Sequence, residues 1–346
     1  MLMPWNIIGH DRQIERFRRA TENRRLASTF LFVGPAGIGK RTFAQQLAAA
    51  LLCQATTTVA LDPCGGCASC LQVAAGAHPD LHLVAKPPDK SMLPLELLIG
   101  DREHRMKTGL CYQMSLKPRA GKRKIAIIDD ADYLNAEGAN CLLKLLEEPP
   151  PGSLIVLITT HANRQLPTIR SRAQLVQFQR LTNEQLAQIL KQQGVADNQE
   201  EALAMARMGQ GSIDRAQRLR DEETQRMRST IHTTLSQQGW QPQALAETVM
   251  EYVESAGKDA PPRRQRLKNT IEFALEYYQK CLYVSSGAPQ PAETTHVANA
   301  TDADCVQCID SCLQAYRHVD ANANLPTLTE WWLSQLRAAT RTSHIL

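Results

Sequence analysis

The sequence has 346 residues, 43% of them hydrophobic, and its 39 Lys and Arg exceed its 35 Asp and Glu by four formal charges. This length allows two or three domains, each able to bury a core. The composition excludes a collagen-like chain, a small disulfide scaffold and a wholly disordered chain, and no apolar run of about 18 residues predicts a membrane span. The mild basic excess permits contact with nucleic acid but does not argue for it.

Cysteine usage indicates the compartment. The first ten residues lack a basic segment followed by an apolar one, so we expect no secretory signal peptide. Four of the ten cysteines, Cys53, Cys64, Cys67 and Cys70, lie close together. In a chain without an export signal, such a cluster indicates metal binding rather than disulfide bonds. We therefore expect a cytoplasmic protein.

The first half of the chain alternates short apolar runs with segments of helical periodicity. We predict strands at residues 30–33, 81–85, 125–128, 154–158 and 175–178. We predict helices at residues 12–26, 42–52, 96–113 and 135–147. Strands that alternate with helices predict a parallel α/β sheet covered on both faces.

Strand signals fade after about residue 180, and the rest of the chain is helical by pattern. We predict an α/β domain at 1–180 with a cysteine insertion at about 53–71. A small helical lid domain is predicted at 181–220. A helical C-terminal domain is predicted at 221–346, with a loop at about 285–304 rich in Pro, Ala, Thr and Ser.

A phosphate-binding loop is predicted at residues 34–40, where Gly-Pro-Ala-Gly-Ile-Gly-Lys fits G-x-x-x-x-G-K between a strand and a helix. Backbone N–H groups of such a loop, together with the helix N-terminus, bind phosphate oxygens. The pattern continues with a Ser or Thr that binds Mg²⁺, but here Arg41 comes next and Thr42 follows one residue later. Because a guanidinium has no lone pair for Mg²⁺, we expect ATP binding more than efficient Mg²⁺-dependent hydrolysis. A purely structural glycine turn is the alternative. The candidate nucleotide-binding residues are Gly34, Gly37, Gly39, Lys40, Arg41 and Thr42.

Two carboxylates follow the strand predicted at 125–128. Asp129 is placed to hold Mg²⁺, directly or through water. Asp130 falls where ATPases of this kind commonly place a Glu that orients the attacking water. Asp is one methylene shorter, which would misplace that water. A solvated acidic turn at this strand end is the alternative interpretation.

The cysteine cluster has the spacing of a metal site. Cys64, Cys67 and Cys70 form C-x₂-C-x₂-C, and Cys53 lies upstream. Four thiolates complete a tetrahedral site without an open position, which suits structural Zn²⁺. An iron–sulfur cluster and free buried thiols are the alternatives. A second group, Cys305, Cys308 and Cys312, shares one helix face, which favours core packing over metal binding.

Three further segments carry a resemblance to a known family. Residues 140–150, Asn-Cys-Leu-Leu-Lys-Leu-Leu-Glu-Glu-Pro-Pro, look like the N-A-L-L-K-x-L-E-E-P-P segment of bacterial clamp loaders. Residues 166–173, Leu-Pro-Thr-Ile-Arg-Ser-Arg-Ala, resemble their L-P-x-T-I-x-S-R-C motif, and residues 5–10 resemble the opening before their phosphate loop. In order and spacing over about residues 5–215, the chain is similar to the delta-prime branch of the AAA+ clamp-loader family of bacterial DNA polymerase III. The related tau/gamma motor subunits are the near alternative.

The resemblance implies roles for particular residues. Thr160 matches the sensor of the γ-phosphate, and Arg172 matches the arginine finger that is offered to ATP on a neighbouring subunit. The family also carries a zinc module at the position of the cysteine cluster. Residues 211–216 resemble the motor's G-S-L-R-D-A segment, but Asp214 and Arg215 stand in exchanged order. This exchange, together with Arg41 and Asp130, disfavours an active motor.

The resemblance also implies an AAA+ fold with a small helical lid and an all-α C-terminal domain. It implies a hetero-pentamer with tau/gamma motor subunits and a clamp-opening delta subunit, which loads a sliding clamp on primed DNA. Within it this chain would supply Arg172 in trans and have weak or no ATPase activity by itself. The alternatives are an ATP-hydrolysing motor and a zinc-stabilised scaffold that binds no nucleotide.

Overall fold

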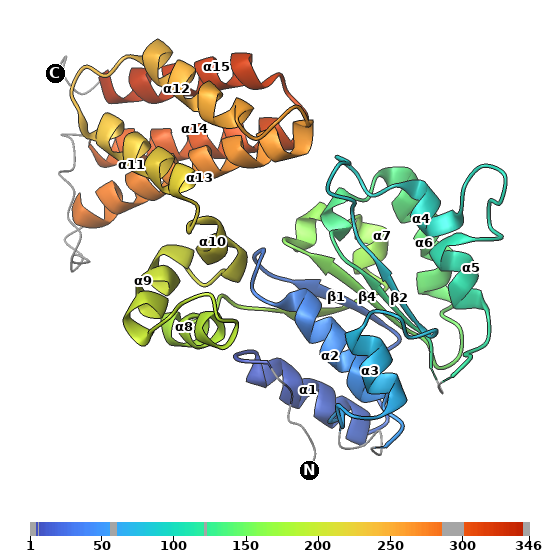
Figure 1. The fold of residues 1–346 in the computed structure, drawn as a ribbon. Helices are drawn as coiled ribbons and strands as arrows, with labels where there is room; N and C mark the ends of the chain where they lie inside the picture. Colours follow the sequence, from blue (N-terminus) through green and yellow to red (C-terminus); the bar gives the residue numbers. More distant parts are fainter. Residues whose placement is uncertain (1–4, 6, 56–60, 121–122, 286–300, 342–346) are drawn as a thin grey trace. The chain divides into compact units, whose positions relative to one another are not determined.

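A computed structural model of the chain describes residue 5 and residues 7–55, 61–120, 123–285 and 301–341 (Figure 1). Its contacts divide the chain into two compact units, Met1–Leu219 and Arg220–Leu346. Most of the loop predicted at 285–304, and part of the cysteine insertion, lie outside the described residues. The division into three domains stays a prediction.

The first unit is built on a five-stranded sheet in the order β2-β3-β4-β1-β5, with every strand parallel to its neighbours. The strands are β1 Thr29–Val33, β2 Leu81–Val84, β3 Ile125–Ile128, β4 Leu154–Thr159 and β5 Gln174–Gln177. They agree with the predicted runs to within one residue at each end. The interior strand β1 pairs with the central strand β4 on one side and with the edge strand β5 on the other, so that Phe30 lies opposite both Val156 and Gln174.

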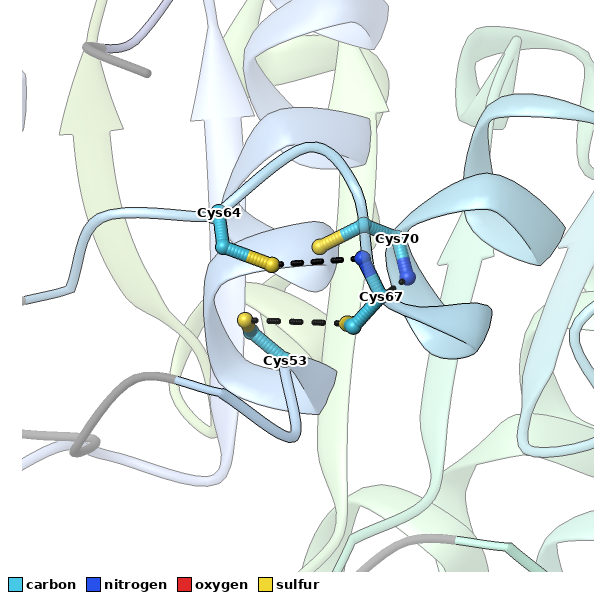
Figure 2. A group of neighbouring side chains, drawn as sticks. All are labelled: Cys53, Cys64, Cys67 and Cys70. Carbon is cyan, nitrogen blue, oxygen red and sulfur yellow. Dashed lines mark hydrogen bonds between the residues drawn. The ribbon is translucent and has the colours of Figure 1, made fainter. Parts of the chain in front are cut away.

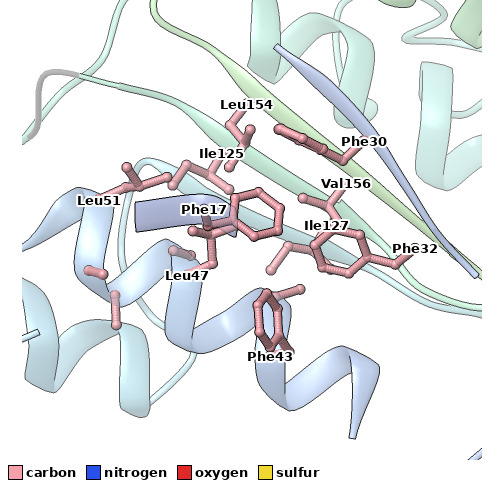
Figure 3. Close-up of a cluster of buried hydrophobic side chains, with 14 of the residues drawn as sticks. Phe17, Phe30, Phe32, Phe43, Leu47, Leu51, Ile125, Ile127, Leu154 and Val156 are labelled. Atoms are coloured by element: carbon pink, nitrogen blue, oxygen red, sulfur yellow. The ribbon is translucent and has the colours of Figure 1, made fainter. Parts of the chain in front are cut away.

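Alternate residues of the strands supply two separate cores, one on each face of the sheet. On one face, Phe30 and Phe32 pack with Phe17 of α1 (Asp11–Glu22) and Phe43 of α2 (Lys40–Leu52), as Figure 3 shows. On the other face, Leu31 and its neighbours pack against α4 (Leu95–Ile99), α5 (Gly109–Ser115), α6 (Ala136–Glu147) and α7 (Pro167–Arg170). A parallel sheet that is buried on both faces requires the continuous apolar runs that the sequence shows.

The single helix predicted at 96–113 is wrong. The structure has two short helices there, α4 and α5, separated by residues 100–108. Gly100 and Met106 have φ values of 85° and 61°, which a right-handed helix cannot contain, and Gly109 begins α5 with a φ of 81°. A Cβ on Gly100 would lie 2.7 Å from the backbone oxygen of His104, so the turn also requires the missing side chain.

The cysteine insertion contains α3 (Ala68–Ala74). Three further helices follow β5 in the first unit: α8 (Asn183–Gln192), α9 (Gln199–Gly209) and α10 (Ile213–Arg218). They have a small core of their own, which includes Leu186, Leu190 and Ala206. Each begins at a side-chain cap, and the first has a full capping box between Thr182 and Gln185. These caps explain why the short helices begin where they do.

Every secondary-structure element of the second unit is a helix, within the residues that the structure describes. It contains α11 (Glu222–Ser236), α12 (Pro242–Glu254), α13 (Ala260–Ser285), α14 (Asp302–Asp320) and α15 (Leu325–Arg341). Cys305, Cys308 and Cys312 are buried along α14, which packs against α13 and α15. Among the described residues they are not part of a group that could hold a metal ion, so the core interpretation agrees with their positions.

His232 couples the stability of this unit to pH. Its Nε2 lies 3.1 Å from the carbonyl oxygen of Phe273, and burial lowers the pKa of His232 from 6.5 to about 4. Between these two values the unfolded chain binds a proton that the folded chain excludes. Acidification from pH 7 to pH 4 should therefore lower the free energy of unfolding by about 2–3 kcal/mol.

Urea unfolding of the full chain at a series of pH values measures this effect. His232→Gln should remove most of the loss between pH 6.5 and pH 4, whereas His318→Gln, at an exposed position of α14, should leave it unchanged. Equal pH dependence in the parent and in His232→Gln would contradict the assignment.

The predicted fold class is confirmed: a parallel P-loop type α/β sheet with a cysteine insertion, followed by small helices and an all-α C-terminal unit. Within the described part of the chain, no helix combines the length and the hydropathy needed to cross a membrane.

Candidate functional site

The loop after β1 has the geometry of a phosphate-binding loop. Gly37 and Gly39 have φ values of 69° and 92°, and Gly39 leads directly into α2. A Cβ on Gly34 would lie 2.6 Å from the backbone oxygen of Phe178, so the loop passes close to the chain after β5. The first N–H groups of α2 have no partner inside the helix and can bind an anion.

Lys40 lies at the start of α2 and is buried to 6% exposure. Its Nζ donates to the carbonyl oxygens of Gly34 and Pro35, at 2.6 and 2.5 Å. Burial lowers the pKa of Lys40 to about 8, and the nearby aspartates oppose the shift. The amine is therefore mostly protonated at pH 7 and is available to a phosphate group.

A cavity of about 450 Å³ opens beside this loop. Its lining brings together most of the residues predicted from the sequence: Gly37, Gly39, Lys40, Arg41, Thr42, Asp129, Asp130 and Thr160. Gly34 is not among the described lining residues. The predicted sites therefore meet in one place, although they come from β1, β3, β4 and α2.

The aspartates after β3 make specific contacts. The Oδ1 of Asp129 accepts from the N–H of Asp130 at 2.9 Å, and its Oδ2 lies 3.5 Å from Nη1 of Arg41. Asp130 has a φ of 54°, and burial next to Asp129 raises the pKa of its carboxyl. The residue predicted to hold Mg²⁺ is thus paired with a guanidinium.

Asp132 joins the end of β4 to the turn after β3. Its Oδ2 accepts from the N–H of Thr160 at 2.7 Å, and its Oδ1 accepts from the hydroxyl of Thr159. This carboxylate fixes the backbone of Thr160, the predicted sensor, at the cavity wall. The sequence analysis did not single out Asp132. An acid four residues beyond a predicted strand, with two consecutive threonines at the end of the next strand, was the available signal.

The small helices contact the phosphate loop directly. The N–H of Ile213 donates to the carbonyl of Gly37 at 2.7 Å, and Asp214 lines the cavity. The Nε of Arg215 donates instead to the carbonyl of Met208. The exchanged order of Asp214 and Arg215 therefore places a carboxylate next to the phosphate-binding loop. Asp214 was not among the site residues predicted from the sequence.

A second cavity of about 280 Å³ shares Gly39 and Thr42 with the first. Five isoleucines contribute to its walls, together with His10 and three glutamines: Ile7, Ile8, Ile38, Ile189, Ile213, Gln46, Gln192 and Gln193. The Nε2 of His10 lies 2.7 Å from the carbonyl oxygen of Ile38, and burial lowers the pKa of this ring. An apolar cavity that adjoins a phosphate loop can take the base of a nucleotide.

The four cysteines of the insertion converge, as Figure 2 shows. Their sulfur atoms all lie within 4.8 Å of one another, and Cys53 Sγ is 3.9 Å from Cys67 Sγ. A tetrahedron with Zn–S bonds of about 2.3 Å has edges of about 3.8 Å, so the donor set fits zinc. N–H groups of Gln54 and Cys70 outweigh the effect of burial and lower the pKa of Cys67, whereas burial raises the pKa of Cys70 to about 12.

Arg172 lies outside the described lining of the cavity, beyond the end of α7. Its Nη2 is 2.7 Å from Glu147 Oε1, at the end of α6, and its Nη1 donates to the carbonyl of Thr168 at 3.0 Å. The side chain keeps 35% of its surface exposed. Glu147 and Thr168 thus hold a guanidinium at the surface, where a second molecule can reach it.

Comparison with known proteins assigns the family. A family model described as "DNA polymerase III, delta subunit" matches residues 9–182, half of the chain. The chain belongs to this family. The match covers the sheet, the phosphate loop, the cysteine insertion and Arg172.

Curated members and relatives of the delta subunit family agree with this assignment. The DNA polymerase III subunit delta' of Pseudomonas aeruginosa is 38% identical over 146 residues, which cover 42% of this chain and 41% of that subunit. The subunit delta' of Bacillus subtilis is 36% identical over 183 residues, 53% of this chain and 51% of that subunit. The subunit tau of Escherichia coli is 28% identical over 222 residues, 63% of this chain and 32% of that subunit. The chain thus spans about half the length of the delta' relatives it matches.

A substitution at Gly37 tests the contact between the phosphate-binding loop and α10. A Cβ there would lie 2.4 Å from Ser212 Oγ and 2.8 Å from Asp214 Cβ. Gly37→Ala should cost about 1–2 kcal/mol for the left-handed backbone and a further 1–3 kcal/mol for the overlap. Gly76 has nearly the same φ, 67°, and its Cβ would meet no atom of the described residues within 4 Å.

Gly76→Ala therefore carries the backbone cost alone. The melting temperature of Gly37→Ala should lie several degrees below that of Gly76→Ala. Limited proteolysis should also cut residues 181–219 faster in Gly37→Ala. Equal melting temperatures and equal cleavage in the two variants would show that α10 does not rest on the loop in solution.

Proposed function

We propose that the chain is a delta-prime type subunit of the bacterial DNA polymerase III clamp loader. It acts in the cytoplasm, in a hetero-pentamer with tau/gamma motor subunits and the clamp-opening delta subunit. Its part in loading the sliding clamp on primed DNA is to offer Arg172 to ATP bound by a neighbouring motor subunit. The observation that carries this proposal is the position of Arg172 at the surface, outside its own nucleotide cavity.

The chemistry of Arg172 supports a role in trans. A guanidinium presents a planar fork of N–H donors that suits the charge developing on a transferred phosphoryl group. Glu147 accepts from one side of that fork and orients it. Because this pair is half exposed, it constrains the side chain without the large cost of a buried charge.

The chain's own nucleotide cavity supports weak or absent turnover. Asp214, rather than an arginine, faces the loop, and Arg41 replaces the hydroxyl that a hydrolytic site uses. Asp130 stands where a longer acid would orient water, and Thr160 keeps the sensor position. We propose that the cavity holds a nucleotide that the chain hydrolyses poorly. The four cysteines hold a structural zinc ion that keeps the insertion folded.

Reconstitution tests the proposal. The full chain is mixed with purified tau/gamma and delta subunits, the sliding clamp and primed DNA, and clamp loading and ATP turnover are measured with and without it. We expect that clamp loading requires this chain and that the chain alone has negligible turnover. Robust turnover by the chain alone would favour the motor alternative, and loading that does not require it would contradict the proposal.

A further inference from the structure

Arg41 and Asp129 meet where nucleotide-binding loops place a metal ion. Arg41 takes the position of the hydroxyl that binds Mg²⁺, at the first turn of α2, and its Nη1 lies 3.5 Å from Asp129 Oδ2. The other oxygen of Asp129 accepts from the N–H of Asp130. Both oxygens of the predicted metal ligand are therefore engaged by groups of the chain itself.

Asp132, which also lines the cavity, does not replace this ligand. Asp132 gives one oxygen to the hydroxyl of Thr159 and the other to the N–H of Thr160. Mg²⁺ requires near-octahedral oxygen ligands at about 2.0–2.1 Å, and a guanidinium beside the site adds repulsion instead of a ligand. The residues present do not fit a magnesium ion at this position.

Two cations of the same cavity can bind an anion, although the carboxylates of Asp129, Asp130, Asp132 and Asp214 also line it. Lys40 and Arg41 are consecutive, and both line the cavity of about 450 Å³ next to the N-terminus of α2. A guanidinium has five N–H donors, so Arg41 can bind Asp129 and phosphate oxygens together. The side chain of Arg41 is 52% exposed, which leaves part of that fork accessible.

We propose that Arg41 supplies the positive charge that a magnesium ion would otherwise supply, and that this cavity binds a nucleoside polyphosphate, ATP or ADP, without a metal ion. This inference rests on the proposed binding of nucleotide. Its consequence is that the phosphates are held by a cation that belongs to the chain. Binding is therefore insensitive to the Mg²⁺ concentration.

Calorimetric titration of the purified full chain with ATP and with ADP tests this proposal, in excess Mg²⁺ and in excess EDTA. The two dissociation constants for each nucleotide should agree within about threefold, a difference of less than 1 kcal/mol. Arg41→Thr restores the hydroxyl and frees Asp129. In this variant Mg²⁺ should tighten ATP binding by about tenfold or more.

Arg41→Met serves as the matched control, because it removes the charge without adding a hydroxyl. It should weaken binding in both buffers and gain no dependence on Mg²⁺, and it provides a second variant if Arg41→Thr fails to fold. A parent chain that needs Mg²⁺, or an Arg41→Thr variant that stays indifferent to it, would overturn the proposal. Absence of binding in both buffers would also overturn it. That result would leave the role of Arg172 standing, because turnover by the neighbouring subunit tests that role separately.

Discussion

Arg172→Ala in the reconstituted clamp loader should lower ATP turnover at the neighbouring motor site by about 10³-fold or more, because arginine fingers contribute about 10³–10⁵ in turnover. The variant loses a half-exposed pair with Glu147, which stabilises the fold by about 1 kcal/mol or less, and exposed hydrogen bonds to Thr168 and Ser171. Assembly should therefore be preserved. Single-turnover ATP hydrolysis by complexes that carry one competent motor site beside this chain measures the effect.

Arg170→Ala is the matched control for this experiment. Arg170 lies two residues earlier, at the end of α7, is also exposed, and donates to Asn163. Its removal should leave turnover within about twofold of the parent, a change of less than 1 kcal/mol in the barrier. Arg170→Ala and Arg172→Ala with equal turnover would refute the assignment of the finger to Arg172.

Loss of zinc should give the second large effect. Cys67→Ser removes one thiolate of the four, and the zinc content should fall from about one ion per chain to near zero. We expect a loss of about 3 kcal/mol or more in the free energy of unfolding. For a unit of this size, that loss lowers the melting temperature by about 6–12 °C. Elemental analysis and calorimetry measure the two quantities.

Cys141→Ser provides the comparison, since Cys141 is a partly buried thiol of α6 outside the cluster. It should keep both the metal and the melting temperature within about 2 °C of the parent. Iron with a visible absorption band in the parent would indicate an iron–sulfur cluster. Four titratable thiols without metal in the native chain would favour free cysteines instead.

The strands could be predicted because a doubly covered parallel sheet requires unbroken apolar segments. Runs such as Phe30–Val33 and Ile125–Ile128 are apolar throughout and buried at every residue, as such a sheet requires. The break at residues 100–108 was missed because its left-handed residues include Met106, whose type gives no warning of a positive φ. The two glycines of the predicted helix, Gly100 and Gly109, were too weak a signal by themselves.

The residues of the nucleotide site could be predicted individually, but most of their partners could not. The glycine-loop motif located Lys40 and Arg41, and the acidic end of the strand predicted at 125–128 located Asp129. Neither gave a sign that Arg41 and Asp129 would pair. The pair of Arg41 and Asp129 depends on the sheet order, in which β4 lies between β1 and β3. Asp132 was missed for the same reason, because its partners Thr159 and Thr160 come from another strand.

The position of β1 between β4 and β5 has a consequence for synthesis of the chain. The strand is made first among the five, but its neighbours β4 and β5 follow more than 120 and 140 residues later. At about 5–20 residues per second, Phe30 emerges from the ribosome roughly 7–30 s before Gln174. Until β4 emerges, β1 exposes four consecutive apolar side chains and has no neighbouring strand to which it can hydrogen-bond. Nascent chains arrested before β4 should therefore be strong ligands for chaperones that bind extended apolar peptides, and release should follow once β5 has emerged.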